Sequence, residues 1–331
     1  MTESIKEIRI DTLRLSVTDR CNLRCIYCMP QGGVPLIPSG EILDYEEIVR
    51  TVKVCVSLGI EKVRITGGEP LVRKGLSRLV GLLARIEGIR DLSLTTNGVL
   101  LAEQAEELQQ AGLHRVTVSL DSLRRDRYRR ITRFDFLDKV WEGIETLFRL
   151  GIEPVKINTV IVRGINDDEV VDFARLTKEL PVETRFIERM PLGEGGRLHG
   201  CGLWEREGIP SRVVIQRIEA EFGPLEPARP IVAIPGPATL YRLPSSKGRV
   251  GVISPVTEPF CSKCSRVRLT PEGKLRNCLL REDAVDLRAA LRQGISDKGL
   301  RELVWDMIQR KTRYWRTEFQ RMEKAMVQIG G

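Results

Sequence analysis

Short runs of aliphatic and β-branched residues alternate with longer amphipathic segments between residues 10 and 190. In the segment 45–58, for example, Ile48, Val52, Cys55 and Val56 share one helical face. Strands that alternate with helices in this way are typical of parallel βα units. The predicted strands are 13–17, 62–65, 91–95, 115–120, 155–161 and 183–188. Six repeats are fewer than the eight of a closed barrel, so we predict an α/β fold built on a partial, open (β/α)6 TIM-like barrel.

Small and polar residues directly follow four of the predicted strands. They are Thr18-Asp19-Arg20-Cys21, Thr66-Gly67-Gly68-Glu69-Pro70, Thr96-Asn97-Gly98 and Asp121. A single Gly-Gly or Asn-Gly pair commonly marks only a tight turn. The loops after parallel strands meet at one rim of a barrel, however, and active sites lie at that rim. The four loops together therefore predict the position of the site.

The chain changes character after residue 190. A glycine-rich loop spans 192–204, and five prolines follow between residues 224 and 237. So dense a proline run is incompatible with a helix or a central strand, and it is typical of a linker. We therefore predict a first domain at 1–222 and a smaller C-terminal domain at 223–331, which ends in a charged helical stretch at 300–327.

Composition narrows the class of protein. The 331 residues include 53 Lys and Arg against 45 Asp and Glu, and 42% are hydrophobic, which excludes a disordered chain. The net charge of +8 permits nucleic acid or a polyphosphate as ligand, but an aromatic content of 5% disfavours a base-stacking surface. No apolar run is long enough for a membrane helix, and the charged N-terminus is unlike a signal peptide. We expect a cytoplasmic protein that binds neither nucleic acid nor membrane.

Most of the eight cysteines fall into two groups of three, Cys21, Cys25 and Cys28, and Cys261, Cys264 and Cys278. Thiolates select zinc or iron-sulfur clusters, and structural zinc requires four ligands. A 4Fe-4S cluster held by three cysteines leaves one iron open for a small molecule. We therefore predict two clusters, although Cys201 or His199 could complete the second site. Cys55 is expected in the core.

The residues around these cysteines resemble a known superfamily. Residues 21–28, Cys-Asn-Leu-Arg-Cys-Ile-Tyr-Cys, are similar to the radical S-adenosylmethionine signature, and Gly67-Gly68-Glu69-Pro70 is similar to the methionine-binding turn of that superfamily. With 15–21, 64–70, 94–98, 260–268 and the terminal Gly330-Gly331, the chain resembles the GTP 3′,8-cyclase family from residue 9 to 331. The resemblance implies a lyase that converts GTP into (8S)-3′,8-cyclo-7,8-dihydroguanosine 5′-triphosphate, the first step of molybdenum cofactor biosynthesis.

The resemblance also implies roles for individual residues. It assigns Cys21, Cys25 and Cys28 to a first 4Fe-4S cluster, and Cys261, Cys264 and Cys278 to a second in the C-terminal domain. It assigns Tyr27, Gly68, Ser119 and Met190 to S-adenosylmethionine. It assigns Arg14, Arg64, Thr95, Lys156, Arg266, Val267 and Arg268 to GTP, with Arg266 and Arg268 also catalytic. Cations within apolar strands are costly unless they face a polar cavity, which agrees with these assignments. The arginine run at 124–133 is instead typical of a solvated helix.

The same resemblance implies partners. They are GTP, an electron donor of the flavodoxin or ferredoxin type, and cyclic pyranopterin monophosphate synthase as the next enzyme; a homodimer stays open. It also implies that the terminal Gly330-Gly331 enters the active site. Two alternatives remain: another radical S-adenosylmethionine enzyme with an auxiliary cluster that acts on RNA or a peptide, and a zinc-stapled nucleic-acid-binding protein.

Overall fold

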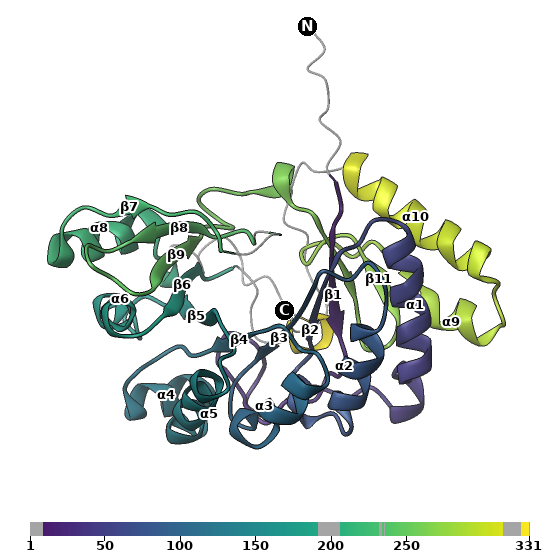
Figure 1. Cartoon of the computed structure of the whole chain (residues 1–331), viewed down its shortest axis with the longest axis horizontal. Coiled ribbons are helices and arrows are strands. Elements are labelled where there is room, and N and C mark those ends of the chain that lie inside the picture. Colours follow the sequence, from purple (N-terminus) through teal and green to yellow (C-terminus); the bar gives the residue numbers. More distant parts are fainter. Residues whose placement is uncertain (1–8, 191–205, 232–233, 235, 314–325, 331) are drawn as a thin grey trace, which may run out of the picture.

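The computed structural model describes residues 9–190, 206–231, 234, 236–313 and 326–330 (Figure 1). Its first six strands are β1 (Thr12–Ser16), β2 (Lys62–Thr66), β3 (Asp91–Thr96), β4 (Arg115–Ser119), β5 (Val155–Ile161) and β6 (Val182–Glu188). The later strands are β7 (Glu226–Pro227), β8 (Thr239–Arg242), β9 (Arg249–Ile253), β10 (Arg266–Leu269), β11 (Lys274–Arg276) and β12 (Ala284–Asp286). Among the described residues they form one open sheet in the order β12-β11-β10-β1-β2-β3-β4-β5-β6-β9-β8-β7.

All six predicted strands are present, and each end differs from its predicted position by at most one residue. Neighbours among β1 to β6 pair in parallel. Two strands from beyond residue 223 continue the parallel sheet, because β10 pairs with β1 and β9 pairs with β6. The predicted partial, open barrel is confirmed, and the C-terminal part of the chain extends it at both edges.

The helices of the βα units lie along the outer side of the curved sheet (Figure 1). They are α1 (Tyr45–Ser57), α2 (Leu76–Ala84), α3 (Leu101–Gln110), α4 (Arg125–Thr132), α5 (Leu137–Arg149) and α6 (Val170–Glu179). The later helices are α8 (Ser211–Phe222), α9 (Leu287–Arg292), α10 (Asp297–Arg313) and α11 (Met326–Ile329). Local sequence explains where α1 begins: Asp44 and Glu47 form a capping box, in which each side chain accepts the other residue's backbone N–H.

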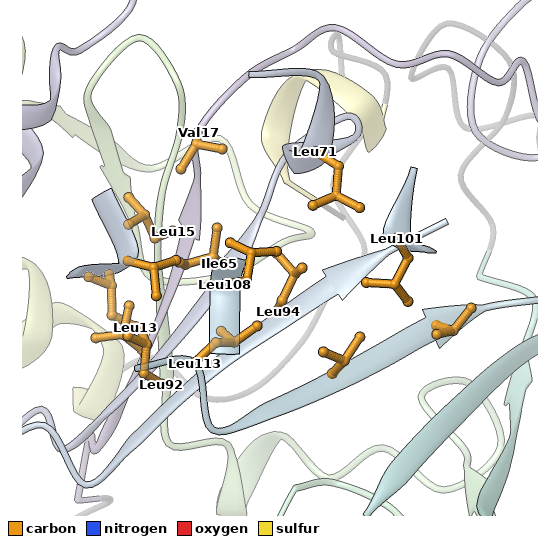
Figure 2. Packing of buried hydrophobic residues seen from close by; sticks show 14 of the residues in the cluster. Leu13, Leu15, Val17, Ile65, Leu71, Leu92, Leu94, Leu101, Leu108 and Leu113 are labelled. Carbon is orange, nitrogen blue, oxygen red and sulfur yellow. The ribbon is translucent and has the colours of Figure 1, made fainter. Parts of the chain in front are cut away.

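The hydrophobic core lies between the sheet and its helices. Leu13, Leu15, Ile65, Leu92 and Leu94 are fully buried there and pack with Leu101 and Leu108 of α3 (Figure 2). Successive side chains of a strand point to opposite faces, so the residues between these leucines face the barrel interior. They are polar or charged and lie in register, with Arg14 opposite Arg64 and Arg64 opposite Ser93. The barrel is therefore apolar outside and polar inside.

The proline run supplies the outermost strand of the sheet. β7 contains Pro227 and pairs only with β8 at the end of the strand order. Proline cannot donate to a second neighbour, so an edge is where it is tolerated. The described residues of the run thus form neither a helix nor a central strand, as predicted. The domain division at residue 222 stays a prediction, because β6 and β9, which lie on either side of it in the sequence, pair in one sheet. Among the described residues, no helix is long and apolar enough to cross a bilayer.

Candidate active site

The first cysteine group lies on the loop after β1. Cys21, Cys25 and Cys28 are half-buried and free of disulfides. Burial raises the pKa of Cys21 to about 11 and that of Cys28 to about 12, and it raises the pKa of Cys25 as well. The negative charges of neighbouring thiolates add to this effect. Three thiols that repel one another when ionised fit an iron-sulfur cluster, because iron displaces their protons and supplies the missing positive charge.

The end of α4 holds this cysteine loop in place. Backbone N–H groups of Arg24 and Ile26 donate to carbonyls at the end of α4, both at 3.0 Å. Arg133 has a left-handed backbone with φ of 66°, and its guanidinium donates to the carbonyls of Arg24 (2.8 Å) and Met29 (3.0 Å). Arg133 therefore differs from the predicted solvated arginine run, because its guanidinium binds the backbone of the cysteine loop.

Two carboxylates that the family assignments do not include connect the rim loops. The first is Asp121, which follows β4. Its Oδ2 accepts from the Tyr27 hydroxyl at 2.5 Å, and its Oδ1 accepts from the Val160 N–H at 2.8 Å. Burial raises the pKa of Asp121 to about 6. Ser119, assigned to S-adenosylmethionine like Tyr27, is half-buried at the end of β4, two residues away.

The second carboxylate is Glu69, which follows the two glycines after β2. Its oxygens accept from the Asn97 N–H at 2.6 Å and from the Thr96 hydroxyl at 2.7 Å. Burial raises the pKa of Glu69 to about 7. The Asn97 amide in turn donates to the Asn22 side chain at 2.7 Å. These contacts tie together the loops after β1, β2 and β3. Their signal in the sequence was that polar residues follow each strand and that Glu69 belongs to the Gly67-Gly68-Glu69-Pro70 turn.

Gly68 is required by close packing within the chain. Its N–H donates to the Thr18 carbonyl at 2.6 Å, and a Cβ at this position would lie 2.4 Å from the Arg20 carbonyl oxygen. The resemblance assigns this glycine to the S-adenosylmethionine site. The structure shows that the loop after β1 already occupies the space of a side chain here, so any larger residue would displace the cysteine loop.

The interior of the barrel concentrates buried cations. Arg268, Arg14 and Arg64 lie side by side in register across β10, β1 and β2, and Lys156 lies on the inner face of β5. Burial, followed by repulsion from neighbouring arginines such as Arg185, lowers the pKa of Lys156 to about 6 and that of Arg64 to about 10. Burial, with repulsion from a neighbouring arginine on β10, also lowers the pKa of Arg268 to about 10. Burial and mutual repulsion thus disfavour the charged forms of these side chains. An anionic ligand would favour the charged forms, so the interior fits such a ligand.

Unpartnered polar atoms line the same interior. Among the described residues, the hydroxyls of Thr95 and Ser93 and the side-chain carbonyl of Asn158 are buried without a hydrogen-bond partner. Buried polar groups are rarely left in this state unless a ligand or water completes them. Of the assigned GTP residues, Val267 differs from the rest, because its side chain is fully buried in the outer hydrophobic core. Only its backbone could contact a ligand.

The second cysteine group surrounds β10 and β11. Cys261 begins a short 3-10 helix (Cys261–Lys263), Cys264 precedes β10, and Cys278 follows β11. Burial alone would raise the pKa of Cys264, but Arg266 and Lys311 outweigh it and lower that pKa to about 6. An easily ionised thiol fits a metal ligand. In the part of the chain that the structure describes, no three Cys, His, Asp or Glu side chains could hold a single metal ion. Cys201, His199 and the loop 192–204 lie outside the described residues.

The C-terminal segment lies between the two cysteine groups. Val327 of α11 packs with Met29 beside Cys21 and Cys28, whereas Ile329 packs against Leu279 and Leu280 with Met190 and Cys278. The Gly330 carbonyl accepts from Arg268 at 2.8 Å, so Gly330 lies at the inner face of the sheet. Met190 thus lies on the side of the second cysteine group. The position of Gly330 is compatible with the predicted entry of Gly330-Gly331 into the active site. Gly331 itself lies outside the described residues.

Comparisons with known proteins cover nearly the whole chain. The sequence profile of the Radical SAM superfamily matches residues 15–177, and that of Molybdenum Cofactor Synthesis C matches residues 182–317. A GTP 3′,8-cyclase of Pelotomaculum thermopropionicum is 48% identical over 323 residues, which are 97% of this chain and 98% of the relative. A GTP 3′,8-cyclase of Thermodesulfovibrio yellowstonii is 47% identical over 324 residues, with the same coverage.

A solved structure supports the fold. Streptococcus suis SuiB bound to S-adenosylmethionine aligns with a TM-score of 0.61 at 12% identity, over 85% of this chain and 64% of SuiB. At that identity the likeness concerns the fold alone. Sequence identity over nearly the full length, together with both profiles, decides the family: the chain belongs to the radical SAM superfamily and, within it, to the GTP 3′,8-cyclase family.

Proposed function

We propose that this chain converts GTP into (8S)-3′,8-cyclo-7,8-dihydroguanosine 5′-triphosphate. In this proposal Cys21, Cys25 and Cys28 hold a 4Fe-4S cluster that binds S-adenosylmethionine, and Cys261, Cys264 and Cys278 hold a second 4Fe-4S cluster. The observation that carries the proposal is the row of adjacent like charges on the inner face of the barrel strands, Arg268, Arg14 and Arg64. The negative charge of a nucleoside triphosphate would offset the repulsion among them.

The charge of the interior explains the choice of a triphosphate. Arg14, Arg64 and Arg268 are adjacent, and like charges at such close range in a buried site are unfavourable. Burying like charges side by side is costly, and a bound polyanion would lower that cost. The unpartnered Thr95 hydroxyl offers a further contact beside the cations.

The cluster and S-adenosylmethionine, when bound, supply one-electron cleavage of a sulfonium and so the radical that removes a ribose hydrogen. The chain's own residues position the reactants. The cations Arg14, Arg64 and Lys156 bind the triphosphate, and Asp121 orients Tyr27 through the 2.5 Å hydrogen bond. The C-terminal segment excludes water from the interior, because Gly330 packs against β1 and accepts from Arg268. Arg266 and Arg268, proposed as catalytic, hold the substrate at the second cysteine group.

Family membership supports a proposal for the partners of the reaction. We propose that a protein of the flavodoxin or ferredoxin type donates the electron and that cyclic pyranopterin monophosphate synthase uses the product. The proposed location is the cytoplasm. The proposal does not include an oligomeric state, and it applies to a monomer or a homodimer alike.

The test is anaerobic reconstitution with iron and sulfide, followed by GTP, S-adenosylmethionine and dithionite. The product is an isomer of GTP, because the hydrogen atom lost from the ribose on ring closure is matched by the hydrogen atom gained in the 7,8-reduction. GTP and the product have the same mass, so chromatography must separate them before mass spectrometry. We expect the isomer from GTP and none from R64M, while R78M, which removes an exposed arginine of α2, behaves as the unchanged chain. Cleavage of S-adenosylmethionine without any loss of GTP would overturn the proposal.

A further inference from the structure

Lys311 is a buried lysine on α10 that no sequence motif singles out. Only 9% of it is exposed. Its Nζ donates to the carbonyl of Arg266 at 2.6 Å, to the carbonyl of Asn277 at 2.7 Å and to the sulfur of Cys264 at 3.3 Å. An ammonium group has three N–H donors, and each of them has an acceptor here. Lys311 is therefore held in one place by three contacts.

These three acceptors belong to the two segments that carry the second cysteine group. Cys264 and Arg266 lead into β10, whereas Asn277 directly precedes Cys278 after β11. One ammonium group thus joins the segment of one cysteine to the segment of another. The distance between the two cysteines depends on this bridge, because Lys311 contacts both segments at hydrogen-bond range.

A second contact from α10 supports the same segment. The Asn277 side chain donates to Asp283 at 3.0 Å, and Asp283 accepts from Arg310 at 3.2 Å. Arg310 and Lys311 are neighbours in sequence, so two successive residues of α10 hold the segment that leads to Cys278. The helix itself packs against α1 of the barrel. The second cysteine group is thereby fastened to the rigid part of the fold.

The charge of Lys311 also requires an explanation. A buried ammonium is costly unless negative charge faces it, and two of its acceptors are neutral carbonyls. Arg266, the other cation beside it, increases this cost. The third acceptor is the sulfur of Cys264, at 3.3 Å from Nζ, and Cys278 directly follows Asn277 in the chain. Two cysteines of the second group therefore lie close to the charge that this site has to accommodate.

We propose that Lys311 is a positioning residue of the second cysteine group, which holds the Cys264 and Cys278 segments together around an iron-sulfur cluster. The inference rests on the proposed second cluster. Groups that hydrogen-bond to a metal ligand orient it and tune the metal, so Lys311 also raises the reduction potential of the cluster. A purely structural anchor for α10 would leave that potential unchanged.

The test compares full-length K311M, K311R and C278A with the unchanged chain, and K298M serves as the matched control because Lys298 is an exposed lysine of the same helix. After anaerobic reconstitution, we measure iron per chain, the rate of iron release to a chelator, and the potential and EPR spectrum of the reduced clusters. We expect K311M to release the iron of the second cluster about tenfold faster and to lower its potential. K311R should keep the potential near its original value, and K298M should match the unchanged chain in every measurement.

The outcomes separate this inference from the proposed function. If C278A holds as much iron as the unchanged chain, the second cluster is absent and the premise fails. If C278A loses iron but K311M keeps the original release rate, potential and spectrum, Lys311 has no positioning role and the inference alone is overturned. If K311M takes up no second cluster, recovery of that iron in K311R supports the inference. A failure of K311R to recover any of it, with K298M intact, counts against the role of the charge.

Discussion

Replacing Lys156 with methionine tests the charge of the barrel interior most directly. Lys156 is 2% exposed on β5 and faces Arg115 of β4, Arg64 of β2, and Arg185 and Glu183 of β6. Burial lowers the pKa of Lys156 most, and repulsion from Arg185 is the next largest cause. Glu183 raises the pKa, but burial and the repulsion from the three arginines outweigh it and bring the pKa to about 6. The amine is therefore mostly neutral at neutral pH while the interior holds no ligand.

The magnitude follows from the difference in pKa between the folded and unfolded chains. The ordinary value for lysine is 10.5, so the unfolded chain binds the proton more tightly than the folded chain does. Between pH 6 and 10.5 the free energy of unfolding therefore rises with pH. Relative to high pH, the lysine lowers stability by up to about 4 kcal/mol at pH 7.5 and by its full amount below pH 6. K156M removes this penalty, so we expect a more stable chain at neutral pH.

Ligand binding should reverse the shift in pKa. Phosphate groups beside Lys156 favour its charged form, so binding of GTP takes up about one proton at neutral pH and weakens as the pH rises. K156M should take up no proton at this site and should bind GTP about 10 to 100 times more weakly, the loss expected for a charged hydrogen bond. Urea unfolding across pH measures the stability, and calorimetry in buffers of different ionisation enthalpy counts the protons.

The matched control is K178M, since Lys178 is exposed on α6. It should leave the pH dependence of both stability and GTP binding unchanged. The reasoning is wrong if K156M has the same dependence of stability on pH as the unchanged chain, or if the unchanged chain binds GTP without taking up a proton.

Three further changes probe other parts of the site. Cys278→Ala should remove about four irons and abolish cyclisation while part of the S-adenosylmethionine cleavage persists, and unchanged iron content would exclude Cys278 as a ligand. A tag added after the C-terminus should abolish cyclisation but spare S-adenosylmethionine cleavage, and full activity with the tag would refute the role of the tail. Gly330→Val should have the same effect, because a Cβ at residue 330 would lie 2.7 Å from Ser16. Arg133→Met leaves the carbonyl of Met29 without this donor and should lower the free energy of unfolding by about 1 to 3 kcal/mol, together with the iron content of the first cluster. Urea unfolding and iron analysis would detect both losses, and equal values would contradict the contact.

Features that depend only on residues close together in the chain could be predicted without the structure. The six strands from residue 12 to residue 188 follow from the period of apolar positions. The first cysteine group is also local, because the spacing of Cys21, Cys25 and Cys28 within one loop brings three thiols together in almost any conformation. Such patterns involve residues that are only a few positions apart, so they can be recognised without knowledge of the fold.

Tertiary structure alone decided which distant segments meet. It placed β9 and β10 at opposite edges of one sheet, brought Arg133 to a loop 104 residues earlier, and brought Lys311 to a cysteine 47 residues earlier. It also showed that Gly68 packs against the chain's own backbone. These contacts depend on how helices and loops pack around the sheet, and a hydrogen bond to a backbone carbonyl leaves no signature in the acceptor's sequence. The residue types of the site could therefore be read along the chain, whereas the contacts that hold them in place arise only when the chain folds.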